Sequence, residues 1–286
     1  MPHPDNSNQE LLHGLGRWIQ HEVDAVRRER IYSFGLVTGL RESKGVFTTP
    51  NFERGLVLDR LCEILRPASV LELGTGRGLG ALTAASAGDA YGYKTAVTTI
   101  DSIPTTTQQR YAIEEHGVRR VDQLSVDEVW KKHVPQEVRQ RVTFLTGPTT
   151  KVLPRLSASG RRFDLVFIDA GHDLFDVIHD LAYSSVLVSD NGVILMDDFA
   201  PRESFGLGTV VAYTHAKRLF HSASVFESDG VVYGAADPMQ PPRGMVLLNQ
   251  PSGRFSLRKN RLWLWRVFDR VLRAAVHKSM FPVRVD

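Results

Sequence analysis

Between residues 52 and 220, short apolar segments alternate with longer stretches whose apolar residues recur every three or four positions. The short segments predict strands, and the spacing of three and four predicts helices. Both sides of each short segment are largely apolar, as expected for strands covered by helices on two faces. The alternation therefore predicts an α/β fold with a doubly wound, mostly parallel seven-stranded sheet. The expected parallel strands are residues 69–73, 96–101, 142–146, 163–169 and 192–197.

Further elements flank this core. Apolar periodicity predicts an N-terminal helix over residues 8–32, and the Gly/Thr/Ser-rich residues 33–51 predict a loop. Ser125 and Glu128 have the spacing of a capping box, which indicates the start of a helix. The other expected elements are helices over 52–65 and 207–220, a helical insertion over 120–141, and an antiparallel edge from 222–226, 231–234 and 245–249. We thus expect an N-terminal helix and lid loop (1–50), a catalytic domain (51–250) and a C-terminal segment (251–286).

The composition narrows the class of protein. Apolar residues make up 42% of the 286 residues and charged residues 23%, close to the average for globular proteins. The single cysteine, Cys62, excludes internal disulfides and cysteine-based metal sites. No apolar run approaches the roughly 18 residues that cross a bilayer, and the first residues lack a signal-peptide pattern. We therefore expect a cytoplasmic protein.

Charge is uneven along the chain. From Arg254 to the end there are nine Lys/Arg and two Asp/Glu, whereas the rest is mildly acidic. Arg266, Arg270 and Arg273 form one polar stripe, with apolar residues on another face, so a basic amphipathic helix is expected here. Three interpretations stay open for this helix: packing on the body or in a homo-oligomer, peripheral attachment to a membrane (residues 258–280), or a partner-protein groove.

The most informative segment is a glycine-rich loop, VLELGTGRGLG, at residues 70–80. A strand leads into glycines and a helix follows, which suits close approach of a ligand to the backbone. Glu72, before the first glycine, is placed to hold a cationic amino group. Asp101, at the end of the next strand, is placed to bind ribose hydroxyls. S-adenosylmethionine carries both groups. Two other interpretations stay open: a purely structural turn, or a nicotinamide dinucleotide site.

This loop, followed by TTID, resembles the first two motifs of the class I S-adenosylmethionine-dependent methyltransferases. The resemblance implies a Rossmann-like methyltransferase fold over about residues 45–250. It also implies that residues 48–52 close over the cofactor, and that residues 102–105 depart from the family pattern. The cofactor-binding residues that it implies are Glu72, Gly74, Thr75, Gly76, Gly78, Asp101, Thr49, Gly147, Thr149 and Asp169.

Three carboxylates end two neighbouring strands of the expected sheet. Asp169 ends one strand, and Asp197 and Asp198 end the next. Carboxyl ends of adjacent parallel strands share one edge, so the three side chains are expected to converge. Closely packed like charges need a cation or a proton, and hard oxygen ligands suit Mg²⁺. Two metal-free interpretations stay open: Asp198 caps the next turn, or one aspartate acts directly as a base.

His172 follows Asp169 by three residues and is the candidate general base, with Asp169 beside it in the catalytic set. The alternative is that His172 caps the helix beginning near Asp173. In the catechol-type enzymes of the resembled family a lysine has this offset, whereas in the macrolide-sugar enzymes a histidine does, together with the Asp-Asp pair. The resemblance therefore implies metal-assisted O-methylation of a sugar hydroxyl on a small glycosylated metabolite, as in secondary metabolism.

Alternatives to this function remain. The first is a catechol or phenol acceptor, the second a nicotinamide-dependent oxidoreductase, and the third a cofactor-binding scaffold without catalysis. Base-directed methyltransferases carry an Asn/Asp-Pro-Pro-aromatic motif where this chain has Asp169-Ala170-Gly171-His172. A broad basic surface with interleaved aromatic residues is also missing from the acidic body, so nucleic acid is not expected as a substrate.

Overall fold

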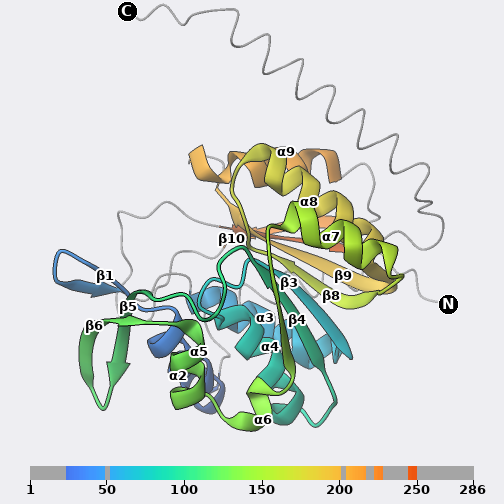
Figure 1. Cartoon of the computed structure of the whole chain (residues 1–286). Coiled ribbons are helices and arrows are strands. Elements are labelled where there is room, and N and C mark those ends of the chain that lie inside the picture. Colours follow the sequence, from blue (N-terminus) through green and yellow to red (C-terminus); the bar gives the residue numbers. More distant parts are fainter. Residues whose placement is uncertain (1–23, 49–51, 201–203, 217–221, 228–243, 250–286) are drawn as a thin grey trace, which may run out of the picture.

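The computed structural model describes residues 24–48, 52–200, 204–216, 222–227 and 244–249 (Figure 1). Their main feature is a seven-stranded sheet. Its strand order is β10 (Ser222–Glu227), β11 (Gly244–Asn249), β9 (Val188–Phe199), β8 (Phe163–Ile168), β3 (Ser69–Leu73), β4 (Ala96–Asp101) and β7 (Val142–Thr146). The strands from β9 to β7 are parallel, and β11 is antiparallel to both β9 and β10. The prediction of a doubly wound, mostly parallel α/β sheet is confirmed.

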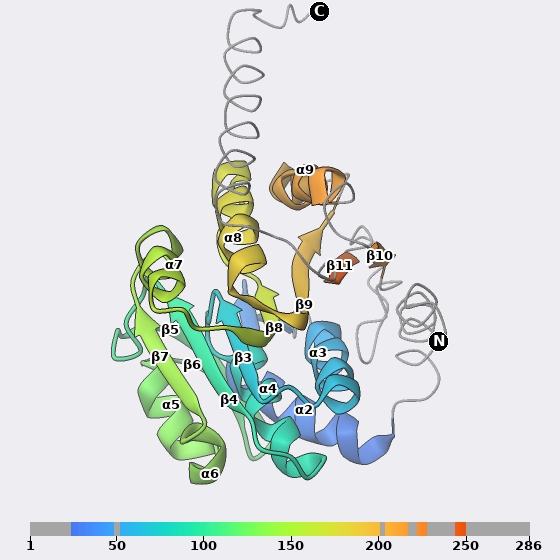
Figure 2. The same cartoon turned by 90° about the vertical axis from the view of Figure 1, so that its right-hand side faces the viewer.

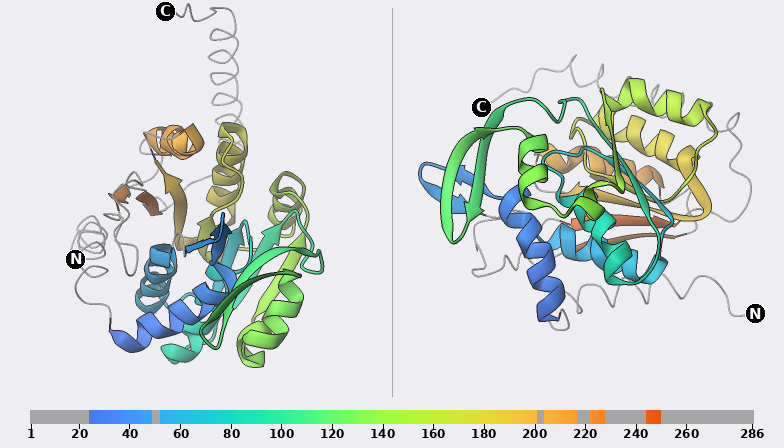
Figure 3. Two further views of the ribbon diagram at one scale, coloured as in Figure 1. Left: turned by 90° about the vertical axis from the view of Figure 1, so that its left-hand side faces the viewer. Right: turned by 60° about the horizontal axis from the view of Figure 1, so that its bottom comes forward.

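Helices cover both faces of this sheet (Figures 2 and 3). On one face lie α2 (Ala25–Thr38), α3 (Phe52–Leu65) and α4 (Leu79–Ala90), and on the other α7 (Thr149–Ala158), α8 (Leu174–Leu187) and α9 (Leu207–Ala216). The strand sequences explain this layering, because successive side chains point to opposite faces. Val70 and Phe167 belong to the core under α3 and α4, whereas Leu71 and Ile168 belong to the core under α8. None of the helices in the described part of the chain combines the length and hydrophobicity that a membrane crossing requires.

The prediction of a loop over residues 33–51 is wrong for most of its length. Helix α2 continues to Thr38, because Phe34 and Val37 extend its buried stripe. A short hairpin follows, β1 (Arg41–Ser43) and β2 (Val46–Thr48). Its two-residue turn, Lys44–Gly45, has φ values of 51° and 82°, the positive values that a tight hairpin turn requires. The expected helix over residues 8–23 lies outside the described residues.

The helical insertion expected over residues 120–141 is only partly correct. A hairpin of β5 (Gln109–Glu115) and β6 (Val118–Leu124) precedes α5 (Val126–His133) and α6 (Gln136–Arg139). Tyr111 and Ile113 are fully buried, so the hairpin is anchored in the core rather than exposed as a helix surface. The capping box is confirmed, because the Ser125 side chain accepts from the Glu128 N–H and the Glu128 side chain accepts from the Ser125 N–H.

Most other boundaries agree with the sequence. Helix α3 and strands β3, β4 and β7 have the expected limits, while β9 extends by four residues at its start and two at its end. The edge strand expected at 231–234, the end of the 207–220 helix and the C-terminal helix lie outside the described residues. Chain connections leave β3 toward β4 on one side and return to β8 on the other. Such a switch point opens a crevice at the carboxyl ends of these strands, where ligands bind.

A short 3-10 helix, η1 (Ser204–Gly206), leads from the end of β9 into α9. Gly206 of η1 lies against Ala200, the residue that follows β9.

Candidate active site

The glycine loop after β3 is shaped by close packing. Gly74, Gly76 and Gly78 have φ values of 89°, 54° and 102°, a region that L side chains rarely adopt. A Cβ at Gly74 would collide with the carbonyl of Asp169, and one at Gly78 would collide with the ring of Trp130. The backbone of this loop therefore lies directly against the end of β8.

Asp101 braces the same loop from the end of β4. Its Oδ2 accepts from the Gly76 N–H at 2.8 Å, and its Oδ1 accepts from the Ile103 N–H at 2.9 Å. Each carboxylate oxygen has a second lone pair, so Asp101 retains capacity for ligand hydroxyls. A cavity of about 370 Å³ lies beside it, and its lining includes Gly76, Asp101, Gly147 and Thr149. Gly147 and Thr149, two of the expected cofactor-binding residues, thus lie in one hollow with Asp101.

Glu72 is almost fully buried beneath the loop, at 2% exposed. The Thr99 hydroxyl donates to it at 2.5 Å, and the Ala81 N–H also donates to its carboxylate. Burial raises the pKa of Glu72 to about 8, and these hydrogen bonds only partly oppose the shift. A bound ammonium group would favour the carboxylate form. The Thr75 hydroxyl lies 2.5 Å from that of Thr99, so it is engaged within the protein.

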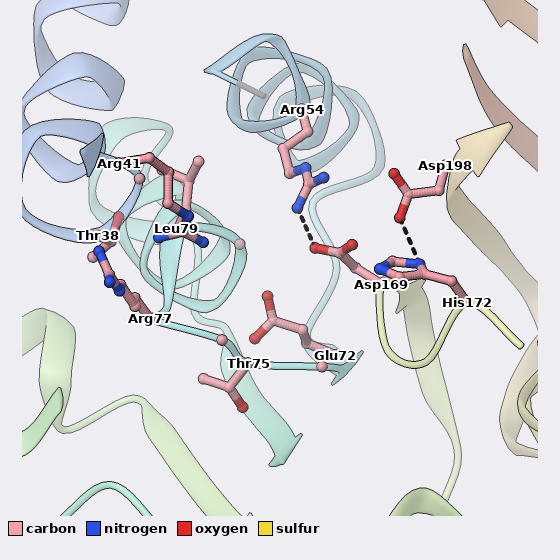
Figure 4. A pocket seen from close by; sticks show the side chains of 14 residues that line it. Thr38, Arg41, Arg54, Glu72, Thr75, Arg77, Leu79, Asp169, His172 and Asp198 are labelled. Carbon is pink, nitrogen blue, oxygen red and sulfur yellow. Dashed lines mark hydrogen bonds and ion pairs between the residues drawn. The ribbon is translucent and has the colours of Figure 1, made fainter. Parts of the chain in front are cut away.

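A second cavity of about 380 Å³ adjoins the first and shares Gly74, Gly76 and Asp169 with it. Its other lining residues are polar or glycine, with the exception of Leu79. Arg41, Arg54 and Arg77 are among its lining residues. Figure 4 shows Arg41 and Arg77 close together beside Thr38, whereas Arg54 lies against Asp169. Burial, and secondly the nearby Arg41, lower the pKa of Arg77 to about 10. The remaining lining residues are Thr38, Gly39, Glu72, Thr75, Gly80, His172 and Asp198.

The three aspartates do converge. One carboxylate oxygen from each of Asp169, Asp197 and Asp198 lies within 4.8 Å of the others. The sequence did not indicate what else is there: the Arg54 guanidinium forms ion pairs with both Asp169 and Asp197. Arg54 comes from the first turn of α3 and is 17% exposed. Burial disfavours its charge, but attraction to Asp197 and Asp169 outweighs that and raises the pKa of Arg54.

His172 pairs with the third aspartate. Its Nδ1 lies 2.9 Å from Oδ2 of Asp198, and about half of its side chain is exposed (Figure 4). This hydrogen bond raises the pKa of His172, against an opposing effect of burial. The N-cap residue of α8 is Asp173 rather than His172, and Nδ1 of His172 is engaged by Asp198. The alternative interpretation of His172 as a helix cap is therefore not favoured.

The sequence analysis did not predict Arg41, Arg54 and Arg77 as site residues. For Arg54 and Arg77, their positions in the sequence offered a signal. Arg54 stands two residues after the loop that the resemblance places over the cofactor, and Arg77 stands within the glycine motif itself. An arginine carries no motif of its own, so only its neighbours in space reveal its role. Thr49, the expected cofactor contact from that loop, lies outside the described residues.

Comparisons with known proteins agree with this geometry. Residues 71–199 match the family model described as a methyltransferase domain (Methyltransf_24). None of the curated proteins matches the chain in sequence. The structure is similar to that of an O-methyltransferase from Bacillus cereus in complex with SAH, at 15% identity and a TM-score of 0.52, with 84% of this chain and 99% of that one covered.

It is also similar to TomG, an O-methyltransferase from Streptomyces achromogenes involved in tomaymycin synthesis, in complex with SAM. Identity is 17% and the TM-score is 0.51, with 85% of this chain and 99% of that one covered. At such low identity these two likenesses show a shared fold.

Proposed function

Because residues 71–199 match a family model described as a methyltransferase domain, we propose that this chain transfers the methyl group of S-adenosylmethionine to a hydroxyl oxygen of a small molecule, a sugar hydroxyl on a glycosylated metabolite. One observation carries the proposal. The His172–Asp198 pair lines the same cavity as the glycine loop and Glu72. A base therefore lies beside the cofactor site, where an acceptor hydroxyl would enter.

In this proposal the two adjoining cavities hold the cofactor, and the one lined by Glu72, His172 and Asp198 also receives the acceptor. Asp101 binds the ribose hydroxyls, Gly147 and Thr149 line the adenine, and Glu72 lies toward the methionine ammonium group. The resemblance to the family supports these roles, and the brace between Asp101 and Gly76 supports the loop conformation that they need.

Methyl transfer from a sulfonium needs alignment more than activation of the methyl group. An acceptor oxygen attacks the methyl carbon while the carbon–sulfur bond breaks, giving S-adenosylhomocysteine. The proton of the hydroxyl must leave, and we assign it to Nε2 of His172. Asp198 holds Nδ1, so it orients the ring and stabilises the protonated imidazole.

A divalent metal fits the donor set of the cluster. Three carboxylate oxygens lie close together and are largely buried, which is the chemistry that Mg²⁺ prefers. We propose that Asp169, Asp197 and Asp198 would hold it. When bound, Mg²⁺ lowers the pKa of a coordinated hydroxyl. In the structure, Arg54 forms ion pairs with two of these carboxylates, those of Asp169 and Asp197.

The polar lining of the cavity favours a sugar over a catechol. Leu79 is the one large apolar side chain among the lining residues in the described part of the chain. Flat aromatic ligands bury apolar area against apolar walls, whereas a polyol needs hydrogen-bonding groups. Arginine and carboxylate side chains supply such groups here.

The test is isotope transfer. The protein is incubated with methyl-labelled S-adenosylmethionine and with matched panels of glycosides and catechols, and products are read by mass spectrometry. We expect a label on a glycoside hydroxyl. Labelling of catechols alone would contradict a sugar acceptor and favour a catechol. Failure to bind S-adenosylmethionine in calorimetry would overturn the proposed function.

A further inference from the structure

Arg54 occupies an unusual position for a basic side chain. It lies in the first turn of α3, is 17% exposed, and its two terminal nitrogens contact carboxylates from two different strands. Asp169 directly follows β8, and Asp197 lies near the end of β9. One guanidinium therefore ties α3 to the ends of β8 and β9. Figure 4 shows its contact with Asp169.

Each of the three aspartates in the cluster forms an ion pair within the protein. Arg54 contacts Asp169 and Asp197, and His172 contacts Asp198. Buried carboxylates this close together need compensating positive charge. The chain supplies that charge itself, from an arginine and a histidine.

A divalent ion would need the same groups. The oxygens that meet Arg54 are Oδ2 of Asp169 and Oδ2 of Asp197. A metal bound to these aspartates would lie close to the guanidinium, and two cations in one small buried site repel each other strongly. The two cations therefore compete for one set of carboxylates.

We propose that Arg54 is the resident cation of the aspartate cluster, and that a divalent ion binds there only by displacing the Arg54 guanidinium. Space for this exchange exists, since Arg54 lines the cavity of about 380 Å³. Arg54 then has two roles. It positions Asp169 and Asp197 when no metal is bound, and it makes metal binding weak and exchangeable.

The first test measures Mn²⁺ binding to the full chain by calorimetry and by electron paramagnetic resonance of free Mn²⁺, without cofactor or acceptor. Arg54→Gln removes the competing charge and should bind Mn²⁺ at least tenfold more tightly than the unmodified protein. Arg60→Gln is the matched control, because Arg60 lies on the same helix and pairs with Glu63 away from the site. The control should bind like the unmodified protein.

Equal or weaker Mn²⁺ binding by Arg54→Gln would overturn the proposal, and so would an absence of binding in both proteins. Loss of the two ion pairs threatens folding, so thermal melts accompany each titration. If Arg54→Gln does not fold, Arg54→Lys takes its place. A lysine keeps the charge but lacks the planar fork that spans two carboxylates. It should bind Mn²⁺ at least threefold more tightly, and unchanged affinity would contradict displacement.

The second test needs no variant at Arg54. Mg²⁺ is titrated into the unmodified protein while the ¹⁵N–¹H signal of the Arg54 side chain is followed by NMR. Displacement predicts that this signal shifts or broadens as the metal binds. Metal binding with an unchanged Arg54 signal contradicts it. Neither test uses methyl transfer, so failure of the proposed function leaves these results interpretable on their own.

Discussion

Oδ2 of Asp198 lies 2.9 Å from Nδ1 of His172, and Asp198 holds this position with a backbone φ of 57°. A positive φ is uncommon for a residue other than glycine, and such strain concentrates at functional sites. The contact sets the orientation of the imidazole, whose Nε2 is then the ring nitrogen directed away from Asp198. Under the proposed function, His172 is the general base and Asp198 is the group that orients it.

Replacing His172 tests the base directly. We expect His172→Ala to lower kcat about 10²- to 10⁴-fold, the range typical of a lost general base, while S-adenosylmethionine affinity changes little. His133→Ala is the control, since His133 pairs with Glu115, which also pairs with Lys132. The measurements are steady-state kinetics and calorimetry. If His172→Ala turns over at the rate of the unmodified protein, His172 is not the general base.

Glu72 should make stability depend on pH. Its pKa is raised to about 8 from an ordinary value of 4.5, so between these values the folded state binds the proton more tightly than the unfolded state. Stability in the absence of cofactor therefore falls as pH rises from about 4.5 to about 8. Glu72→Gln cannot lose a proton there, so its Tm relative to the unmodified protein should increase between pH 5 and pH 8.

The same variant should bind S-adenosylmethionine more weakly, because the ammonium group loses its carboxylate partner. Thermal melts across this pH range, with and without S-adenosylmethionine, measure both the pH dependence of Tm and the stabilisation by the cofactor. A Tm difference that does not change with pH would show that Glu72 is ionised in both states.

The glycine loop should not tolerate a side chain at Gly74. Gly74→Ala adds a Cβ against the Asp169 carbonyl in a backbone conformation at φ 89°. Gly92→Ala is the control for conformation alone, because Gly92 has φ 68° with open space around its Cβ. Left-handed strain costs about 1–2 kcal/mol. We expect Gly74→Ala to lose clearly more stability than Gly92→Ala in urea unfolding, and equal losses would contradict the collision.

Asp101 should control cofactor affinity. Asp101→Asn leaves one side-chain carbonyl oxygen where two oxygens now accept from Gly76 and Ile103. We expect S-adenosylmethionine to bind about tenfold more weakly, equivalent to about 1.4 kcal/mol. Calorimetry measures this, with Asp89→Asn as a control in α4, where Asp89 pairs with Arg141. Unchanged affinity would contradict the assignment of Asp101 to the ribose.

Removing divalent metal should affect methyl transfer and S-adenosylmethionine binding differently. Under the proposed function, excess chelator lowers methyl transfer far more than it weakens S-adenosylmethionine binding, because Asp169 is the one proposed metal ligand that lines the cavity around Asp101. The readout is turnover with and without chelator, followed by restoration with Mg²⁺. Full activity in chelator would mean that no metal is required, and that Arg54 and His172 alone compensate the negative charge of the three aspartates.

The sequence by itself determined the sheet and the placement of its carboxylates. Strands such as β3 and β4 are short apolar segments with both faces covered, so their limits follow from local pattern. Asp101 is the last residue of β4 and Asp169 directly follows β8, so chain order alone places them at strand ends. Local pattern failed at residues 109–124, where polar and charged residues alternate with few apolar ones and the anchoring of Tyr111 in the core decides the hairpin.

Tertiary structure alone decided what meets the carboxylates. Arg54 is 115 residues from Asp169 in the chain, and no spacing rule joins an arginine on a helix to two strand ends. The fold brings them together because α3 packs over the sheet beside β8, and the energy of paired charges depends on distance in space rather than along the sequence. The pairing of His172 with Asp198 has the same origin, since adjacent parallel strands present their carboxyl ends at one edge.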